Sequence, residues 1–510
     1  MTSENLKTIH SNSENVSEAF GQDPYLGYST LDEAINDCKA SSQTEILARL
    51  LNHENLFISG PAGSGKSSVI KPFVNLLMHE APEVNVAITA YTGVAATLID
   101  GVTLHSWSGV DMPDPKFVGL KHIENRKTVD VLIIDEVSMV PAHFFESLDH
   151  TLRKAKGNDD PFGGIQLVLL GDFMQLPPVP SKGKDTEFCI LSESWKNANI
   201  KLCYLDKVHR ARDQRLQSVL NAISRDKVDD SIEELLNTRV NAKPQANKRY
   251  VNLFTTNRKI DDYNEKELAK IQSPEKIYDV IPHFDYGQSS QKKVNEHIRN
   301  ADLKPLTLKV GAPVILTRNT YMGETLIPNG AIGEVKELQR NSVIVDFNSH
   351  GVNRICRTYD SIKEKQLYID RKGKKHSVDV EIGSVEHLPL KIGFAISVHK
   401  SQGSVYDGIV ADLSNAFMPG LGYVALSRVR DLDDLIITGL GDKALQVNQR
   451  SLRISQIVKK GALKNRRKFI EEKSEYDEIL TNRYARALVW MGLGSGVDTS
   501  TSETFESMKF

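Results

Sequence analysis

Residues 56–67 read Leu-Phe-Ile-Ser-Gly-Pro-Ala-Gly-Ser-Gly-Lys-Ser, an apolar run that passes into a glycine-rich loop ending in Lys66 and Ser67. A strand, such a loop and a following helix form a cradle for phosphate groups, because backbone N–H groups turn inward and the helix N-terminus adds positive potential. Lysine then reaches the β- and γ-phosphate oxygens and the hydroxyl ligates Mg²⁺. The segment predicts a site for ATP and Mg²⁺. The residues expected to form it are Gly60, Gly63, Ser64, Gly65, Lys66, Ser67 and Ser68.

Two adjacent carboxylates end a later apolar run, Val131-Leu-Ile-Ile-Asp-Glu-Val-Ser-Met139. Next to a bound triphosphate, Asp135 would hold Mg²⁺ directly or through water, and Glu136 would orient and deprotonate the attacking water. An isolated Asp-Glu pair is usually a solvated strand end. The phosphate loop upstream supplies a cation for this one, so we expect a metal ligand at Asp135 and a general base at Glu136.

A third apolar run, 167–170, leads into Gly171-Asp-Phe-Met-Gln-Leu-Pro-Pro178. An amide at a strand tip beside the nucleotide responds to the presence of the γ-phosphate, and Gln175 is the candidate for this sensor. By itself the segment is an ordinary turn that ends in proline. Together with the first two runs it predicts one sheet edge that surrounds a nucleotide.

Short apolar runs alternate with helical stretches along much of the chain, which is typical of an α/β fold with parallel sheets covered on both faces. The first set of predicted strands comprises 56–59, 86–90, 131–134 and 167–170, and the second set comprises 250–255, 312–316, 409–413 and 435–438. Between 330 and 387 the pattern changes to short alternating strands with charged turns, at 331–335, 342–347 and 377–382. This interruption predicts a small β-barrel inserted in the second sheet domain. The basic run at 371–375 is either a solvated hairpin tip or a phosphate contact.

Composition and charge restrict the class of protein. With 510 residues, 40% of them apolar and 25% charged, the chain is expected to form a multidomain enzyme of roughly three or four packed units. A formal net charge of −2 means that contacts with nucleic acid must be local. The spacing of the four cysteines argues against a disulfide framework, a zinc site or an iron–sulfur cluster, and predicts buried thiols in a reducing compartment. They are Cys38, Cys189, Cys203 and Cys356.

The termini and hydropathy predict a soluble intracellular protein, cytoplasmic if bacterial or viral, with no membrane partner. No stretch approaches the 18 or so apolar residues of a membrane helix, and residues 1–20 lack an apolar signal core. Residues 1–30 and 497–510 are rich in Ser, Thr, Asn and Glu, and we expect mobile tails there.

Several ordered blocks resemble those of superfamily-one helicases of the 5′-to-3′ group, over roughly residues 43–440. They are Ala90-Tyr-Thr-Gly-Val-Ala-Ala96, Thr103-Leu-His-Ser106, Val398-His-Lys-Ser-Gln-Gly403 and Gly422-Tyr-Val-Ala-Leu-Ser-Arg428. The segment Pro161-Phe-Gly-Gly-Ile-Gln166 is similar to the signature of the Pif-one family in particular. One position departs from the family pattern, since Tyr91 stands where the block usually has proline.

The resemblance implies two RecA-like parallel-sheet domains, an SH3-like β-barrel inserted in the second, and a helical C-terminal segment. The implied boundaries are 1–40 for an N-terminal tail and lead-in, 41–205 for the first RecA-like domain with a wedge insertion at about 101–127, 206–329 with 388–445 for the second, 330–387 for the barrel, 446–496 for C-terminal helices and 497–510 for a tail.

The same resemblance implies further contacts with the nucleotide. Gln43 would read the adenine edge, and Arg210 and Arg428 would reach the γ-phosphate from the second sheet domain. Guanidinium suits this work because it stays charged and offers a fork of donors. Gln402 and Gly403 would approach the phosphates or relay their state.

The family's DNA-facing segments match positions with hydroxyl, imidazole, amide and ammonium groups, which hold a single strand by its phosphates without reading its sequence. These positions are Thr92, His105, Ser106, Asn257, His399, Lys400 and Ser401.

The implied activity is an ATP-dependent 5′-to-3′ DNA helicase. It would translocate on single-stranded DNA, bind duplex junctions, and unwind duplexes, with G-quadruplexes and RNA–DNA hybrids as further substrates and DNA repair, recombination and replication as its settings. We expect a monomer when the protein is free. Two alternatives stay open: a P-loop ATPase that clamps nucleic acid without unwinding it, and an RNA-directed translocase of the same superfamily. An ATPase that only clamps nucleic acid would not need Arg210, Arg428 and the block at 399–403.

Overall fold

The computed structural model describes most of the chain between residues 41 and 472. The described ranges are 41–110, 126–178, 187–206, 208, 212–246, 248, 250–285, 288–322, 325–327, 329–347, 351–369 and 375–472. These residues form two compact units, one from 1–255 with 401–510 and one from 256–400. The predicted tails, Cys38, most of the wedge insertion, Arg210 and nearly all of the basic run at 371–375 lie outside the described residues.

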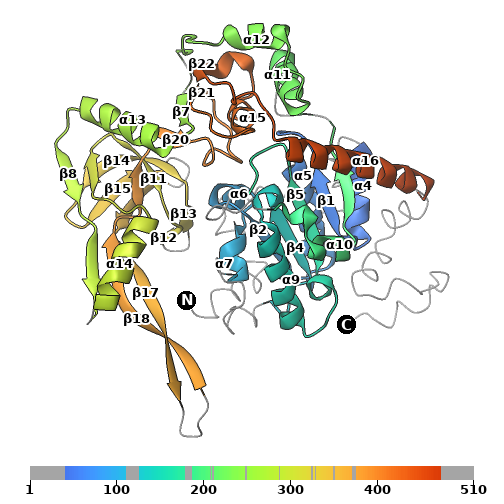
Figure 1. Ribbon diagram of the computed structural model, residues 1–510, viewed down its shortest axis with the longest axis horizontal. Helices are drawn as coiled ribbons and strands as arrows, with labels where there is room; N and C mark the ends of the chain where they lie inside the picture. Colours follow the sequence, from blue (N-terminus) through green and yellow to red (C-terminus); the bar gives the residue numbers. More distant parts are fainter. Residues whose placement is uncertain are drawn as a thin grey trace. The chain divides into compact units, whose positions relative to one another are not determined.

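The first unit contains a six-stranded parallel sheet with the order β3-β2-β4-β5-β1-β6 (Figure 1). All four strands predicted in the first set are confirmed, and β3 and β6 are additions at the two edges. The strands are β1 (Leu56–Ser59), β2 (Val86–Ala90), β3 (Val102–Thr103), β4 (Val131–Asp135), β5 (Gln166–Gly171) and β6 (Lys201–Tyr204). Because the strands are parallel, the carboxyl ends of β1, β4 and β5 meet at one edge of the sheet.

Helices cover both faces of this sheet because side chains alternate along each strand. Leu56 and Ile58 pack under α4 and α5, whereas Phe57 packs on the opposite face with α9 and α10. All three are fully buried, and this two-sided burial explains why the strand is a continuous apolar run. The helices are α4 (Ser41–Leu51), α5 (Lys66–Glu80), α6 (Gly93–Leu98), α7 (Leu104–Ser108), α9 (Ala142–Lys156) and α10 (Glu193–Asn197), with 3-10 turns η1 (Val137–Met139), η2 (Pro161–Gly164) and η3 (Cys189–Leu191).

A second group of parallel strands belongs to the same unit, with β21 (Gly408–Leu413) between β7 (Tyr250–Phe254) and β22 (Leu435–Leu440). One prediction for this sheet is wrong. The run at 312–316 forms β11 (Pro313–Leu316), which pairs antiparallel with β14 and β19 in the second unit. A short apolar run indicates burial, but it carries no information about the neighbouring strand. The accompanying helical elements are α11 (Gln214–Ser224), α12 (Asp230–Asn237), α15 (Leu421–Leu426), η5 (Leu432–Asp434) and α16 (Gln449–Glu471).

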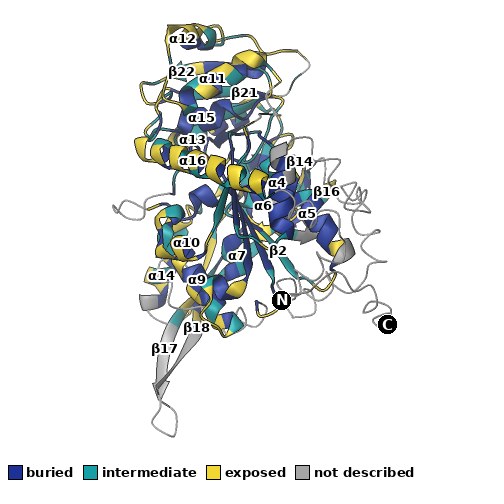
Figure 2. Ribbon diagram, turned by 90° about the vertical axis from the view of Figure 1, so that its right-hand side faces the viewer, coloured by how far each residue is buried: buried dark blue, intermediate teal, exposed yellow. Residues whose placement is uncertain are grey.

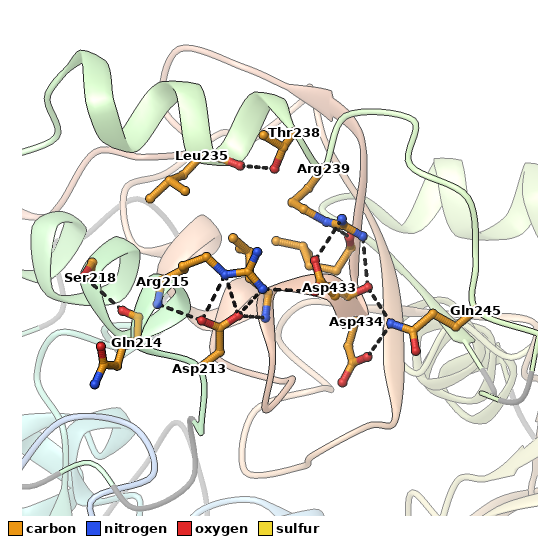
Figure 3. A network of polar contacts seen from close by, with 12 residues as sticks. Asp213, Gln214, Arg215, Ser218, Leu235, Thr238, Arg239, Gln245, Asp433 and Asp434 are labelled. Atoms are coloured by element: carbon orange, nitrogen blue, oxygen red, sulfur yellow. Dashed lines mark hydrogen bonds and ion pairs between the residues drawn. The ribbon is translucent and has the colours of Figure 1, made fainter.

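Charged side chains attach α11 and α12 to the start of β22 (Figure 3). Arg215 bridges Asp213 and Asp433 at 2.8 and 3.0 Å. Arg239, just after α12, donates to the side chain of Asp433 at 3.2 Å and to its backbone carbonyl at 2.9 Å. Gln245 adds a bond to the same carbonyl at 3.2 Å. Asp433 is therefore the shared acceptor that holds this helical pair in place.

The second unit is rich in antiparallel strands. Its largest sheet has the order β16-β15-β14-β11-β19, and a long hairpin of β17 and β18 pairs with β9. Because β9, β11 and β19 lie outside 330–387, strands from beyond the predicted barrel complete its sheets, and its SH3-like character stays a prediction. The elements are α13 (Asn257–Lys270), β8 (Glu275–Tyr278), β9 (Ile281–Phe284), α14 (Gln288–Asn300), β10 (Leu306–Lys309), β12 (Thr320–Met322), β13 (Thr325–Ile327), β14 (Ile332–Leu338), β15 (Ser342–Asp346), β16 (Val352–Cys356), β17 (Thr358–Ile369), β18 (Lys375–His387), β19 (Leu390–Ile392) and β20 (Ala395–Ser397).

The cysteine prediction is correct for two residues and wrong for one. Cys189 and Cys203 are buried, and burial raises the pKa of both thiols. Cys356 is exposed, because it ends β16 next to Ile355, which points into the core, and successive side chains of a strand face opposite sides. In the described part of the chain, the helices are too short or too polar to cross a bilayer.

Candidate nucleotide-binding and hydrolysis site

The glycine-rich loop connects β1 to α5. A Cβ on Gly60 would lie 2.6 Å from the carbonyl oxygen of Leu205, so only glycine fits at this close approach. Gly65 precedes α5 with φ of 82°, in the left-handed region that favours glycine. No side chain caps α5 at this end. Its first N–H groups therefore face the loop as donors, the arrangement that binds an anion.

Lys66 lies over the loop that precedes it. Its Nζ donates to the carbonyl oxygens of Gly60 at 2.8 Å and Pro61 at 3.1 Å. Its positive charge also acts on two carboxyl groups, Asp135 and Asp172, whose pKa values it lowers against the larger opposing effect of burial. The ammonium group thus occupies the centre of the predicted phosphate site.

Ser67 and Asp135 come together at the carboxyl edge of the sheet. The hydroxyl of Ser67 donates to Asp135 Oδ2 at 3.0 Å, across 68 residues of sequence. Burial and the negative charge of Glu136 raise the pKa of Asp135. A hydroxyl and a carboxylate are ligands that suit Mg²⁺, and this ion commonly takes its remaining ligands from phosphate and water. Among the described residues, no group of three His, Cys, Asp or Glu side chains is placed to hold a metal ion.

Glu136 adopts an unusual backbone conformation, with φ of 54° and ψ of 39°. For a residue other than glycine, this left-handed conformation costs about 1–2 kcal/mol. The side chain is buried, and its Oε2 accepts a hydrogen bond from Gln402 Nε2 at 3.0 Å. The strained turn between β4 and η1 thus directs a carboxylate toward the segment that contains Gln402.

Three buried polar atoms around this edge have no hydrogen-bond partner in the described structure. They are Ser64 Oγ, Gln175 Oε1 and Gln402 Oε1. Buried polar atoms are normally paired, so such a group needs an explanation. Their loop and strand-end positions fit a polar ligand such as a nucleotide with its bound water.

Asp172 and Tyr423 form a contact that the sequence prediction missed. The Tyr423 hydroxyl, on α15, donates to Asp172 Oδ2 at 3.1 Å and accepts from the Ala62 N–H at 3.3 Å. Asp172 Oδ1 also accepts from the Met174 N–H at 3.0 Å. The phenol therefore joins the phosphate loop, the turn leading to Gln175, and α15. Both residues stand inside quoted sequence blocks, but nothing in those blocks shows that they pair.

Replacing Tyr423 with phenylalanine is expected to lower the free energy of unfolding by about 1–3 kcal/mol, because a buried carboxylate and a buried N–H each lose a partner. Tyr423 is 1% exposed, so water does not readily replace the hydroxyl. Urea unfolding measures the effect. Tyr359→Phe is the matched control, since Tyr359 is 62% exposed. Equal unfolding midpoints for the two variants would show that the buried bond contributes nothing.

Arg428 is 1% exposed, and its guanidinium is engaged with neighbouring protein groups. It donates to the carbonyl of Val424 at 2.8 Å, to the hydroxyl of Ser427 at 2.7 Å, and to the carbonyl of Ser404 at 3.2 Å. These bonds attach the segment around Gln402 to α15. The contact of Arg428 with the γ-phosphate stays a prediction.

The structure shows the positions of three other residues that were predicted to contact the nucleotide, and their roles stay predictions. Gln43 is buried in the first turn of α4. Gly403 has φ of 85° and approaches Ala95. Ser68 donates its hydroxyl to the Gly65 carbonyl at 2.7 Å. Arg210 lies outside the described residues.

Three of the four predicted DNA contacts in the first unit lie at the β2 and β3 edge of the sheet. The hydroxyl of Thr92 accepts from the Ala95 N–H at 3.2 Å, and the N–H of Ser106 donates to Thr103. The ring of His105 lies 5.0 Å from that of Tyr91, the residue that departs from the family pattern. Ser401, by contrast, is fully buried.

Three predicted DNA contacts belong to the second unit. Asn257 begins α13 and is exposed, and the Lys400 N–H donates to the Ser397 hydroxyl at 3.2 Å. Burial lowers the pKa of His399. The DNA-binding role of all seven positions stays a prediction.

Comparisons with known proteins agree on one family. The family model described as PIF1-like helicase matches residues 38–247. The ATP-dependent DNA helicase Pif1 of Psychrobacter sp. (strain PRwf-1) is 32% identical over 463 residues, covering 80% of this chain and 69% of that protein. The ATP-dependent DNA helicase PIF1 of Xenopus laevis is 33% identical, covering 80% of this chain and 62% of that protein, so the chain spans less than two thirds of this vertebrate relative. A solved structure, Pif1 helicase from Bacteroides in complex with ADP-AlF3 and ssDNA, aligns with a TM-score of 0.70 at 28% identity, covering 82% of this chain and 97% of that one.

Proposed function

Because this chain belongs to the PIF1-like helicase family, we propose that it is an ATP-dependent DNA helicase that moves along single-stranded DNA from 5′ to 3′ and unwinds the duplex it meets. The observation that carries this proposal is the cluster at the carboxyl edge of the first sheet. There Lys66 lies in the loop, Ser67 meets Asp135, and Glu136 is held by Gln402.

Each residue of the cluster has a role in hydrolysis. The N–H groups at the start of α5 and the ammonium of Lys66 would hold the phosphate oxygens. Ser67 and Asp135 would hold Mg²⁺, which neutralises charge on the β- and γ-phosphates when bound. Glu136 would take the proton of the attacking water. Gln175, with its unpaired amide oxygen, would respond to the γ-phosphate.

Gln402 links this chemistry to the second group of parallel strands. Its amide donates a hydrogen bond to Glu136 Oε2. The other carboxylate oxygen, Oε1, would accept the proton of the water, and the bond from Gln402 would orient the group. Since Arg428 attaches the Gln402 segment to α15, a change at Glu136 during hydrolysis would be transmitted to that region. The single strand would bind through Thr92, His105, Ser106, Asn257, His399, Lys400 and Ser401, and the free protein would be a monomer.

A strand-displacement assay on three duplexes tests the polarity. We expect the duplex with a 5′ single-stranded tail to open, and the blunt duplex and the duplex with only a 3′ tail to stay closed. A protein that moves toward the 3′ end of its bound strand reaches the junction only when it starts on a 5′ tail. Lys66→Ala is the negative control for ATP dependence. Opening of the 3′-tailed duplex alone would refute the polarity.

ATP hydrolysis in the same samples separates the alternatives. Turnover should be low without nucleic acid and should rise with single-stranded DNA, with little dependence on base sequence and a decline as salt increases. Stimulation by DNA without strand displacement would instead identify an ATP-dependent clamp. Stronger stimulation by RNA than by DNA would identify an RNA-directed translocase.

A further inference from the structure

Helix α16 carries a row of cations on its outer surface. The helix contains eight lysines and arginines and a single acidic residue, Glu471, at its end. Arg453, Lys460, Lys464 and Arg467 are all exposed. They are separated by seven, four and three residues, and at about 100° per residue this places them within an arc of about 60° along about 21 Å of helix. We call these four residues the basic row; the ribbon of α16 is yellow in Figure 2 where its residues are exposed.

The opposite side of α16 fixes the helix to the edge of the first sheet. Asn465 donates to the Leu202 carbonyl of β6 at 3.0 Å, and Arg49 donates to the Asn465 carbonyl at 2.7 Å. Gly461 passes so close to Leu202 that a Cβ would lie 2.6 Å from its side chain. Val458 is fully buried on the same side. The basic row is therefore presented by a rigid support.

Other cationic side chains of α16 contact an acidic or aromatic side chain, whereas those of the basic row have no acidic partner among the described residues. Arg450 pairs with Glu187 at 2.9 Å, Arg466 lies 3.9 Å from Glu45, and Lys468 pairs with Glu472 at 3.3 Å. Lys459 lies over the ring of Tyr204. Within the described ranges, none of the four residues in the basic row forms an ion pair. The row is thus an uncompensated line of positive charge on a chain whose net charge is −2.

The location of the row separates it from three of the predicted single-strand contacts. Thr92, His105 and Ser106 lie at the β2 and β3 edge of the six-stranded sheet, whereas α16 packs on β6 at the other edge. Four strand spacings of about 4.8 Å separate β2 from β6, or about 19 Å, before the helices are added. Nucleic acid bound at the β2 and β3 edge therefore reaches the row only if it extends across the width of the sheet.

We propose that the basic row binds the phosphate backbone of a duplex arm while the single strand occupies its own path; this rests on the proposed function. A duplex carries about one negative charge per 1.7 Å of axis, so a row of about 21 Å faces enough phosphates to engage all four cations. A duplex is also stiff, so it spans the width of the sheet without an additional path of contacts. An acidic protein surface is the competing occupant, and it predicts no effect on DNA binding.

The test removes three charges of the row in Lys460→Ala/Lys464→Ala/Arg467→Ala. The matched control is Lys196→Ala/Lys270→Ala/Lys336→Ala, which makes the same change in net charge at exposed lysines that pair with nearby glutamates. Fluorescence anisotropy gives the Kd of each protein for a 5′-tailed duplex and for the tail alone, over a series of salt concentrations. Thermal melting shows whether each variant is folded.

We expect the row variant to bind the tailed duplex at least about tenfold more weakly than wild type at low salt, and to lose about 2–3 from the slope of log K against log salt. Its affinity for the tail alone and its ATPase stimulated by single-stranded DNA should stay within twofold of wild type. An unchanged duplex slope, or an equal loss on the tail alone, would overturn the proposal. Failure of the wild type to hydrolyse ATP with single-stranded DNA would instead refute the proposed function.

Discussion

Replacing Glu136 with glutamine is expected to lower the turnover number for ATP hydrolysis by about 10²–10⁴-fold, because the amide cannot accept the proton of the attacking water. ATP binding should persist, since the Ser67–Asp135 pair and the loop are untouched. The new side chain has nearly the same shape, and its carbonyl oxygen can still accept the bond from Gln402. The fold around it is therefore expected to stay intact.

Steady-state hydrolysis with saturating single-stranded DNA, together with the Kd of a fluorescent ATP analogue, separates turnover from binding. Glu146→Gln is the matched control, because Glu146 is exposed on α9. Wild-type turnover in Glu136→Gln would remove Glu136 from the chemistry. Loss of nucleotide binding would assign it a structural role.

Replacing Lys66 with alanine is expected to abolish detectable hydrolysis and unwinding, a loss of at least about 10²–10³-fold, because the developing charge on the phosphates loses its donor. Unlike Glu136→Gln, this variant should also bind nucleotide more weakly, since the lysine acts on the phosphates before and during the reaction. The variant keeps Gly60 and Gly65, which the backbone of the loop requires, and loses the two bonds from Nζ to the carbonyls of Gly60 and Pro61.

Lys154→Ala, an exposed lysine on α9, controls for the change in net charge. Circular dichroism and melting should be close to wild type for both lysine variants. Near-normal turnover in Lys66→Ala would refute the assignment of the phosphate site.

The first sheet was predictable because its strands are buried on both faces. Such strands are continuous apolar runs, and the functional residues follow directly at their carboxyl ends, as Asp135 follows 131–134. The second unit was harder, because antiparallel strands with one exposed face give weaker patterns and their partners lie far away in sequence. The run at 312–316 was assigned to the wrong sheet, because a buried apolar run does not identify the strand that pairs with it.

The contacts within the site were predictable only in part. Local roles of Lys66 and Ser67 follow from the loop sequence, and the link between the two sheets was implied only by the family resemblance. The bond from Gln402 to Glu136 joins residues 266 positions apart, and that from Tyr423 to Asp172 joins residues 251 positions apart. No local pattern encodes such pairs, since each depends on how helices and strands pack in three dimensions.

At Glu136 the left-handed backbone conformation lowers thermal stability, whereas the side chain at the same position is proposed to act in catalysis. Glycine at this position would relieve the conformational strain, and it would also remove a buried carboxylate. A screen that rewards heat resistance alone would therefore tend to select an inactive enzyme here. Keeping glutamate at such a turn would require selection for turnover itself.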